Sequence, residues 1–172
     1  MGTRIAINGF GRIGRLTLRC LLERRNIEVV AINDLADMEN LANLFKHDTA
    51  QGVYPGKVRA LDSAITVGRR QIPVFNQPDP ASLPWKRLRV DLVLDCTGVF
   101  RTSDEAGKHL QAGARRVALS APAKGDGVTT VVLGVNDEIL QPADRIVSNA
   151  SCTTNCLAPV VKVIDTHFGI VQ

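Results

Sequence analysis

The chain alternates short apolar runs with longer stretches in which apolar residues recur every three or four positions. Short runs bounded by turn residues are typical of buried strands, and the wider spacing is typical of amphipathic helices. The runs predict strands at residues 5–8, 29–32, 90–96, 116–120, 130–134 and 145–148. The amphipathic stretches predict helices at residues 12–25, 37–46, 102–112 and 152–167. Strands joined through helices in this way predict an α/β fold with a doubly wound, mostly parallel sheet.

Three local signals refine this picture. Residues 56–75 interrupt the alternation and predict short strands, with a hairpin turn at residues 67–70. Thr102 and Glu105 have the spacing of a capping box, in which a hydroxyl and a carboxylate bond the free backbone N–H groups at a helix start. Gly113 follows the last residue of that helix and predicts a left-handed C-terminal cap.

A glycine motif follows the first predicted strand and opens the first predicted helix. Gly9-Phe10-Gly11-Arg12-Ile13-Gly14 has the G-x-G-x-x-G spacing. In this context Gly9 permits a tight turn, Gly11 admits a pyrophosphate to the backbone, and Gly14 allows close helix–strand packing. The helix N-terminus then stabilises the phosphate charge. These features predict a Rossmann-type dinucleotide-binding domain.

Asp34 supplies the acidic partner of this motif at the end of the second strand, 34 − 14 = 20 residues after the last glycine. A carboxylate there accepts hydrogen bonds from the adenosine ribose and repels a 2′-phosphate, and Leu35 offers no positive charge to hold one. NAD is therefore favoured over NADP. The alternative is a structural glycine turn followed by an ordinary helix-capping aspartate, and the joint occurrence of all these conditions argues against it.

Further cofactor contacts are expected where other parallel strands end, because ligands bind beyond the carboxyl ends of such sheets. Thr97 and Gly98 follow one strand, Phe100 comes shortly after them, and Ser120 ends the next strand. The alternative for these residues is a plain role in turns.

A second chemical site is predicted at Cys152. Small polar residues precede an apolar run that contains Pro159, so Cys152 lies in the first turn of a helix that the proline should kink or distort. The helix dipole and free N–H groups there stabilise a thiolate, and with Ser151 and Thr153 they could hold an oxyanion or inorganic phosphate. A structural thiol is the alternative.

The other cysteines and the histidines are not expected to take part in this chemistry. Cys20, Cys96 and Cys156 are interpreted as small packed hydrophobes. His47 and His109 are expected to lie in solvent, and a straight helix would put the third histidine, His167, about 22 Å from Cys152. No convincing base for the thiol is found, and no Cys or His cluster suggests a metal site.

Composition excludes several functional classes. No apolar run reaches membrane-spanning length and no signal peptide is recognised, so a cytoplasmic protein without disulfides is expected. The net charge is +4, but the basic residues are scattered in pairs and aromatic residues make up only 4% of the chain. A nucleic-acid partner is therefore not favoured.

Five segments together closely resemble the glyceraldehyde-3-phosphate dehydrogenase family. They are residues 7–15, 31–34, 95–100, 119–124 and 148–156, the last being Ser-Asn-Ala-Ser-Cys-Thr-Thr-Asn-Cys. The resemblance covers essentially the whole chain. It implies that Cys152 forms a thiohemiacetal with glyceraldehyde 3-phosphate, that hydride passes to NAD, and that inorganic phosphate attacks the thioester. The product would be 1,3-bisphosphoglycerate, in glycolysis or gluconeogenesis.

The resemblance also assigns roles to individual residues. Ser151 and Thr153 look like the site of the attacking phosphate, and Pro78 replaces an arginine that the family often carries at the adenine. The residues that look like cofactor contacts are Phe10, Gly11, Arg12, Ile13, Asp34, Thr97, Phe100 and Ser120.

Family members form homotetramers and are about twice this length, which implies a two-domain enzyme. Residues 1–150 would form the NAD-binding domain, and residues 151–172 would begin a truncated catalytic domain that lacks the histidine base. Such a chain is expected to bind NAD without turning over alone. Erythrose-4-phosphate dehydrogenase and a non-catalytic NAD-binding module are the alternatives, and residues 119–124 favour the glyceraldehyde enzyme over the erythrose one.

Overall fold

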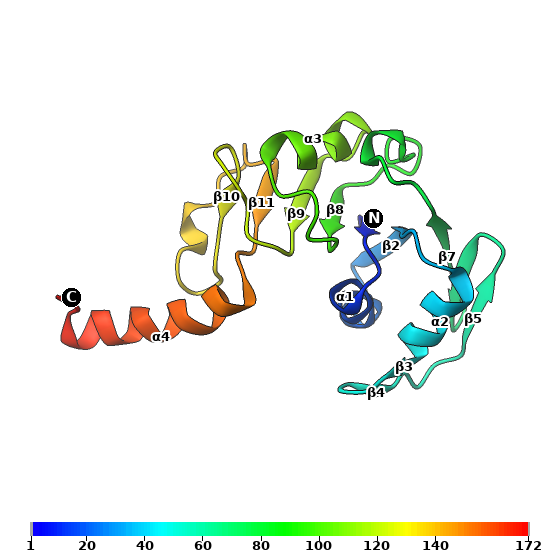
Figure 1. Ribbon diagram of the computed structural model, residues 1–172, viewed down its shortest axis with the longest axis horizontal. Helices are drawn as coiled ribbons and strands as arrows, with labels where there is room; N and C mark the ends of the chain where they lie inside the picture. The colour runs from blue at the N-terminus through cyan, green and yellow to red at the C-terminus, as the bar shows by residue number, and fades with distance from the viewer. Residues whose placement is uncertain (1, 172) are drawn as a thin grey trace.

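A computed structural model describes residues 2–171, which form a long twisted sheet with helices on both faces (Figure 1). The strand order is β10-β11-β9-β8-β1-β2-β7-β6-β5, and the first seven of these strands run parallel. The parallel strands are β1 (Thr3–Asn8), β2 (Ile27–Asn33), β7 (Arg70–Phe75), β8 (Leu92–Asp95), β9 (Arg116–Leu119), β10 (Thr129–Thr130) and β11 (Ile146–Ser148). The predicted doubly wound α/β fold is confirmed.

The remaining elements extend or cover this sheet. Strands β5 (Val58–Leu61) and β6 (Ala64–Val67) continue it antiparallel, with the predicted turn around Gly68, and β3 (His47–Asp48) pairs with β4 (Gly52–Val53). The helices are α1 (Arg12–Leu22), α2 (Met38–Lys46), α3 (Ser103–Gln111) and α4 (Cys152–Phe168), with short 3-10 turns at Pro80–Ser82 and Asp137–Ile139.

The chain changes direction across the sheet at β1. From β1 it moves outward through β2 to β7, and it then returns to place β8 on the other side of β1. Such a reversal opens a crevice beyond the carboxyl ends of the two strands that flank it, and ligands bind there in open α/β sheets. The loops after β1, β2 and β8 therefore border the position where a ligand is expected.

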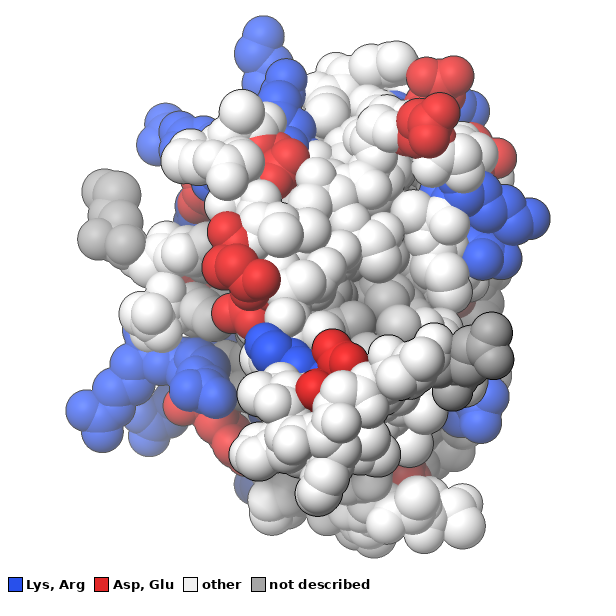
Figure 2. Space-filling view, turned by 90° about the vertical axis from the view of Figure 1, so that its left-hand side faces the viewer, with Lys and Arg blue, Asp and Glu red and all other residues white. Residues whose placement is uncertain are grey.

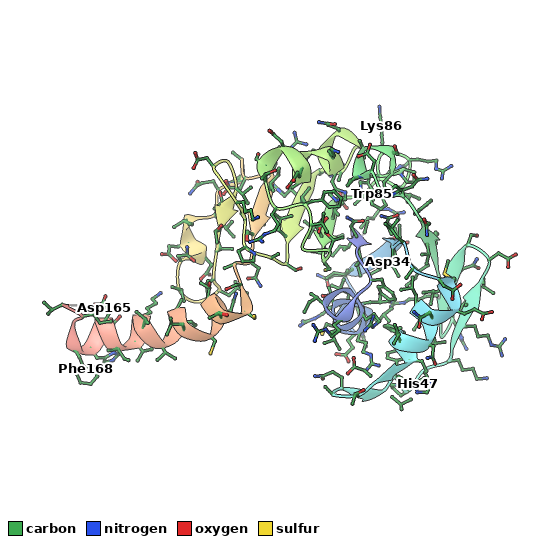
Figure 3. All side chains as sticks on the ribbon, in the orientation of Figure 1. Asp34, His47, Trp85, Lys86, Asp165 and Phe168 are labelled. Atoms are coloured by element: carbon green, nitrogen blue, oxygen red, sulfur yellow. The ribbon has the colours of Figure 1, made fainter. Side chains whose placement is uncertain are left out.

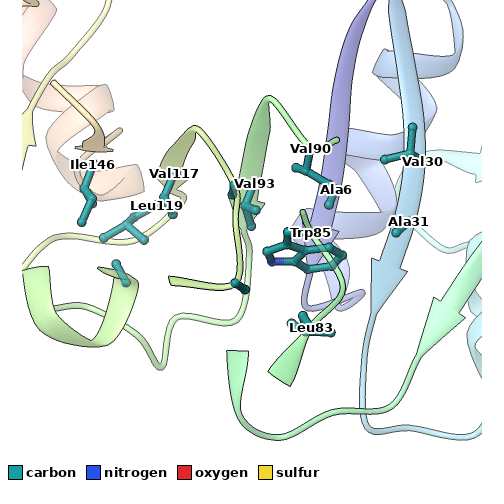
Figure 4. Close-up of a cluster of buried hydrophobic side chains, with 13 residues drawn as sticks. Ala6, Val30, Ala31, Leu83, Trp85, Val90, Val93, Val117, Leu119 and Ile146 are labelled. Carbon is teal, nitrogen blue, oxygen red and sulfur yellow. The ribbon is translucent and has the colours of Figure 1, made fainter. Parts of the chain in front are cut away.

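Alternating residues of the central strands supply two cores, one on each face of the sheet. Ala6 packs in a cluster with α3 residues around Trp85 (Figure 4), whereas its neighbour Ile7 packs with Phe10 and Phe45 under α1 and α2. Successive side chains of a strand point to opposite faces. Both faces of β1 are consequently buried, and packing on both sides fixes the position of the loop that follows β1.

Helix starts agree with the local signals. Asp37 accepts a hydrogen bond from Asn40 N at 2.9 Å to cap α2, and the predicted capping box of α3 is complete between Thr102 and Glu105. Gly113 has φ +102°, the left-handed conformation predicted for it.

Two predictions, one about the sheet and one about α1, are wrong. The strand expected at residues 130–134 stops at Thr130, because the Asn136 side chain accepts from Val132 N at 2.8 Å and turns the backbone away. Cys20 is exposed instead of packed. It lies two residues, or about 200° of helix rotation, beyond the buried Leu18, so it faces solvent.

Helix α4 extends away from the sheet and carries no buried residue (Figure 1). It continues through Pro159 without interruption. Lys162 Nζ ties it back to the domain through the carbonyl oxygens of Gly134 and Val135, at 2.9 and 2.8 Å. Apolar side chains project outward along it, and Phe168 near its end is 85% exposed (Figure 3). In the view onto the end of the molecule that carries α4, much of the surface is uncharged (Figure 2).

Candidate functional site

The glycine loop between β1 and α1 is tightly constrained. Gly9 has φ +86°, and its N–H donates to Asn33 O at 2.8 Å. A Cβ on Gly14 would overlap the carbonyl oxygen of Gly9, whereas a Cβ on Gly11 would meet no atom within 4 Å. Gly9 therefore shapes the turn, Gly14 allows the helix to approach it, and Gly11 leaves open space at the helix N-terminus.

A groove of about 410 Å³ opens at this loop, beyond the carboxyl ends of β1, β2 and β8. Of the predicted cofactor residues, it brings together Gly9, Gly11, Asp34, Thr97 and Phe100. Seven further residues line the groove, and they are Asn8, Asn33, Leu35, Gln77, Pro78, Cys96 and Val99. Leu35 and Pro78 were already expected near the adenosine, and the other five were not predicted from the sequence. Asn8 and Asn33 carried a usable signal, because each is a polar residue at the end of an apolar strand.

A second hollow of about 210 Å³ lies beside the first, with Cys96 in the lining of both. Ile13 and Ser120, both predicted as cofactor contacts, line it together with Asn149. Cys96 lines both hollows, and it is half-buried and packs against the core under α1 and α2, as expected for a packed residue. Burial, followed by the nearby Asp95 charge, raises the pKa of the Cys96 thiol to about 11. The thiol is therefore protonated near neutral pH and acts as a wall of the groove.

Asp34 stands at the rim of the groove, one residue after β2. Its Oδ2 accepts from Phe10 N at 2.6 Å and its Oδ1 accepts from Ala36 N at 2.9 Å. A carboxylate has about four acceptor positions. Asp34 can therefore fix the glycine loop and still accept hydrogen bonds from a ligand hydroxyl.

Four other predicted contacts lie outside the lining of the larger groove. The Phe10 side chain is fully buried and stacks against Phe45 with ring centroids 5.9 Å apart, so only its backbone is available to a ligand. Gly14 is buried under the glycine turn. Arg12 and Gly98 are exposed, and each directly follows a residue that lines the groove, Gly11 and Thr97 respectively.

Cys152 begins α4 and is exposed. Ser151 caps the helix by accepting from Thr154 N at 2.9 Å, and the N–H groups of Cys152 and Thr153 have no partner within the helix. Ala150, just before them, is held at φ +56°, which is rare for a residue with a side chain. The exposed thiol and the Thr153 side chain thus lie at the positive end of a helix dipole.

Cys156 and His109 differ from the predictions. Cys156 is exposed instead of packed, because nothing in residues 2–171 covers α4. His109 is completely buried instead of solvated, because its two ring nitrogens contact Trp85 and Asp95. His47 is exposed and lies across the molecule from α4 (Figure 3). His167 lies 167 − 152 = 15 residues beyond Cys152 in α4.

No group of three or more His, Cys, Asp or Glu side chains suited to a metal ion occurs within residues 2–171. Over that range, no helix combines the length and the apolar character that a membrane span requires.

Comparison with known proteins agrees with this geometry. Residues 3–103 match the family model "Glyceraldehyde 3-phosphate dehydrogenase, NAD binding domain", and residues 151–172 match the model of that family's C-terminal domain. Relatives named glyceraldehyde-3-phosphate dehydrogenase include those of Thermotoga maritima (54% identity over 98% of this chain and 51% of the relative) and Mycoplasma pneumoniae (51% identity, 98% and 50%). The relative from Zymomonas mobilis is 52% identical over 100% of this chain and 52% of its own length.

The chain thus spans about half the length of the curated relatives it matches. The matched region contains the glycine loop, the groove and Asp34, and the second match begins at the residue that caps α4. On this evidence, the chain belongs to the glyceraldehyde 3-phosphate dehydrogenase family.

Proposed function

We propose that the groove binds NAD, with the pyrophosphate on the N-terminus of α1 and the adenosine ribose on Asp34. The observation that carries this proposal is the open Cβ position of Gly11, which lines the groove where the helix begins. Free N–H groups at a helix N-terminus favour phosphate. Arg12, Ile13, Thr97, Gly98, Phe100 and Ser120 are proposed as further contacts, and Gly9, Phe10 and Gly14 as the residues that shape the loop.

Charge supports NAD over NADP. In the described part of the chain, the lining of the groove includes the Asp34 carboxylate and no Lys or Arg side chain. A 2′-phosphate would meet a negative charge at the ribose, with no cation to offset it.

The full-length activity that we propose is the oxidative phosphorylation of glyceraldehyde 3-phosphate to 1,3-bisphosphoglycerate, in glycolysis or gluconeogenesis. Cys152 Sγ would attack the aldehyde carbon and form a thiohemiacetal, and the exposed position of the thiol leaves it accessible. NAD, when bound, accepts the hydride that converts this adduct to a thioester. Inorganic phosphate held by Ser151 and Thr153 would then attack the thioester carbon, so that the C–S bond breaks and the thiolate leaves.

The proton that leaves the thiohemiacetal hydroxyl needs an acceptor. His109 is buried with both ring nitrogens engaged, His47 is remote, and His167 would lie about 22 Å along α4 from Cys152. We therefore assign the base to a part of the full-length protein beyond residues 2–171. We also propose that residues 1–150 form the NAD-binding domain and that residues 151–172 begin the catalytic domain, which the matches at residues 3–103 and 151–172 support. The full-length protein is proposed to be a cytoplasmic homotetramer.

Calorimetry with NAD tests the binding proposal. The wild-type chain should bind NAD, and Asp34→Ala should raise the Kd at least about tenfold, because hydrogen bonds to a charged group contribute about 1.5–3 kcal/mol. Asp62→Ala is the matched control, since it removes the same charge from an exposed position between β5 and β6. A folded wild-type chain that does not bind NAD, or equal losses in the two variants, would overturn the proposal.

A further inference from the structure

A cluster of buried polar side chains lies beneath the groove, and the proposed chemistry does not use it. Its members are 0–4% exposed and come from β1, β2, β8, α3 and the loop before β8: they are Asn8, Asn33, Trp85, Asp95 and His109. Burying polar groups costs free energy unless each finds a partner. The bonding of this cluster therefore shows what it holds in place.

Geometry fixes the protonation state of His109. Trp85 Nε1 lies 2.9 Å from His109 Nδ1, and an indole N–H can only donate, so Nδ1 accepts and carries no proton. The proton is then on Nε2, which donates to Asp95 Oδ2 at 3.1 Å. His109 is thus a neutral ring whose single tautomer joins Trp85 to Asp95.

Asp95 transmits this arrangement to one wall of the groove. Its Oδ2 also accepts from Asn8 Nδ2 at 2.8 Å, and its Oδ1 accepts from Thr97 N at 3.0 Å and Thr97 Oγ1 at 2.6 Å. Thr97 Oγ1 in turn accepts from Val99 N at 3.1 Å. The carboxylate therefore receives four donors and sets the backbone after β8, which lines the groove.

The other wall is tied to the same cluster through Asn33. Asn33 Nδ2 donates to Asn8 Oδ1 at 2.7 Å and to Gln77 O at 2.9 Å, and Asn33 Oδ1 accepts from Gln77 N at 2.9 Å. Because β8, β1, β2 and β7 are consecutive in the sheet, the loops after β8 and β7 flank the groove. One hydrogen-bonded chain runs beneath it from Gln77 to Thr97.

We propose that His109 is a positioning residue for the adenosine end of the dinucleotide. The hydrogen bonds that link Gln77, Asn33, Asn8, Asp95 and Thr97 set the separation of the two walls. His109 holds the Asp95 carboxylate in the orientation that accepts from both Asn8 and Thr97. Phe100 also packs edge-on against the His109 ring, with centroids 6.2 Å apart. The inference rests on the proposed binding of NAD, and it assigns His109 no contact with the ligand.

Calorimetry with NAD and with AMP tests this role in three variants. His109→Phe removes the donor to Asp95 and the acceptor of Trp85, and His109→Gln restores one donor and one acceptor. Val90→Ala is the control, because Val90 is 1% exposed in the same core and has no polar side-chain atom. His109→Phe should raise both Kd values by the same factor, about tenfold, which corresponds to one hydrogen bond. His109→Gln should recover most of the loss, and Val90→Ala should stay within about twofold of wild type, because the Val90 side chain makes none of the hydrogen bonds beneath the groove.

The measurements distinguish failure of the positioning role of His109 from failure of the proposed NAD binding. A wild-type chain that binds NAD and AMP, with unchanged affinity in His109→Phe, would refute the positioning role and leave NAD binding intact. A folded wild-type chain that binds neither ligand would instead refute the proposed function. Nitrogen NMR of the wild-type chain gives a readout that needs no variant: the imidazole should be the neutral Nε2–H tautomer. AMP should also shift the indole N–H resonance of Trp85, the one tryptophan of the sequence. An imidazolium, an Nδ1–H tautomer or an unmoved indole resonance would overturn the inference.

Discussion

Substitution by alanine should have different effects at two glycines of the β1–α1 loop. In Gly11→Ala, the new methyl group meets no protein atom within 4 Å, but it enters the groove where the pyrophosphate is proposed to bind. In Gly14→Ala, the methyl group overlaps the Gly9 carbonyl oxygen and lies 3.3 Å from Ile7 Cγ2. We expect the first variant to lose affinity and the second to lose stability.

The magnitudes follow from these contacts. Loss of one hydrogen bond to a charged phosphate costs about 1.5–3 kcal/mol, so Gly11→Ala should raise the Kd for NAD about 10- to 140-fold. Its stability should change by less than about 1 kcal/mol, because the site is an N-cap. Overpacking against backbone costs about 3 kcal/mol in Gly14→Ala, and the better helix propensity of alanine offsets about 1 kcal/mol. A net loss of about 2 kcal/mol lowers the Tm by about 4–8 °C in a domain of this size.

Thermal unfolding without ligand and calorimetry with NAD separate the two effects. Both measurements are made on both variants and on the wild-type chain at one protein concentration. If Gly11→Ala binds NAD as tightly as the wild-type chain, the pyrophosphate does not approach that position. If Gly14→Ala melts at the wild-type temperature, the close approach of α1 to the turn is not a constraint on the fold.

Three further predictions concern stability, pH and reactivity. Thr102→Ala should cost about 1 kcal/mol in chemical denaturation, because it removes the N-cap of α3; an unchanged midpoint would contradict this. Backbone N–H groups of Thr102 and Arg101 lower the pKa of Glu105 below 4.5, so this cap should be complete above pH 4.5 and be lost as pH falls through the lowered pKa. Amide chemical shifts of Thr102 and Arg101 across that range check it, with Glu105→Gln as a control that should show no such titration. With a pKa of about 11, Cys96 is about 0.1% thiolate at pH 8, so alkylation followed by mass spectrometry should modify Cys96 far more slowly than the exposed Cys20, and equal rates would refute the assignment.

Much of the fold could be predicted because local patterns and global topology agree. The apolar run of β1, the glycine loop and the caps of α2 and α3 each depend on neighbouring residues, and the sequence displays these directly. The strand expected at residues 130–134 failed for a different reason. Its composition suits a strand, but the Asn136 side chain competes for the backbone donor of Val132.

Other features depend on contacts between distant segments. His109 lies three residues after the buried Ala106, so the helical face was readable, but its partners Trp85 and Asp95 are 24 and 14 positions away in sequence. The groove residues Gln77 and Pro78 follow β7, whose place beside β2 is set by the sheet and not by any local pattern. The exposure of Cys156 depends on what covers α4, which the helix pattern does not contain.

The central position of β1 has a consequence for synthesis of the chain. β1 leaves the ribosome well before β8, yet the two strands pair, and Ile5 lies opposite Leu92. Leu92 follows Ile5 by 92 − 5 = 87 positions, which take about 4–17 s to translate at about 5–20 residues per second. During that interval the apolar residues of β1 have only β2 as a neighbouring strand until β8 emerges. Nascent chains of this protein should therefore need chaperone protection early, and slower translation of residues 34–91 would prolong that need.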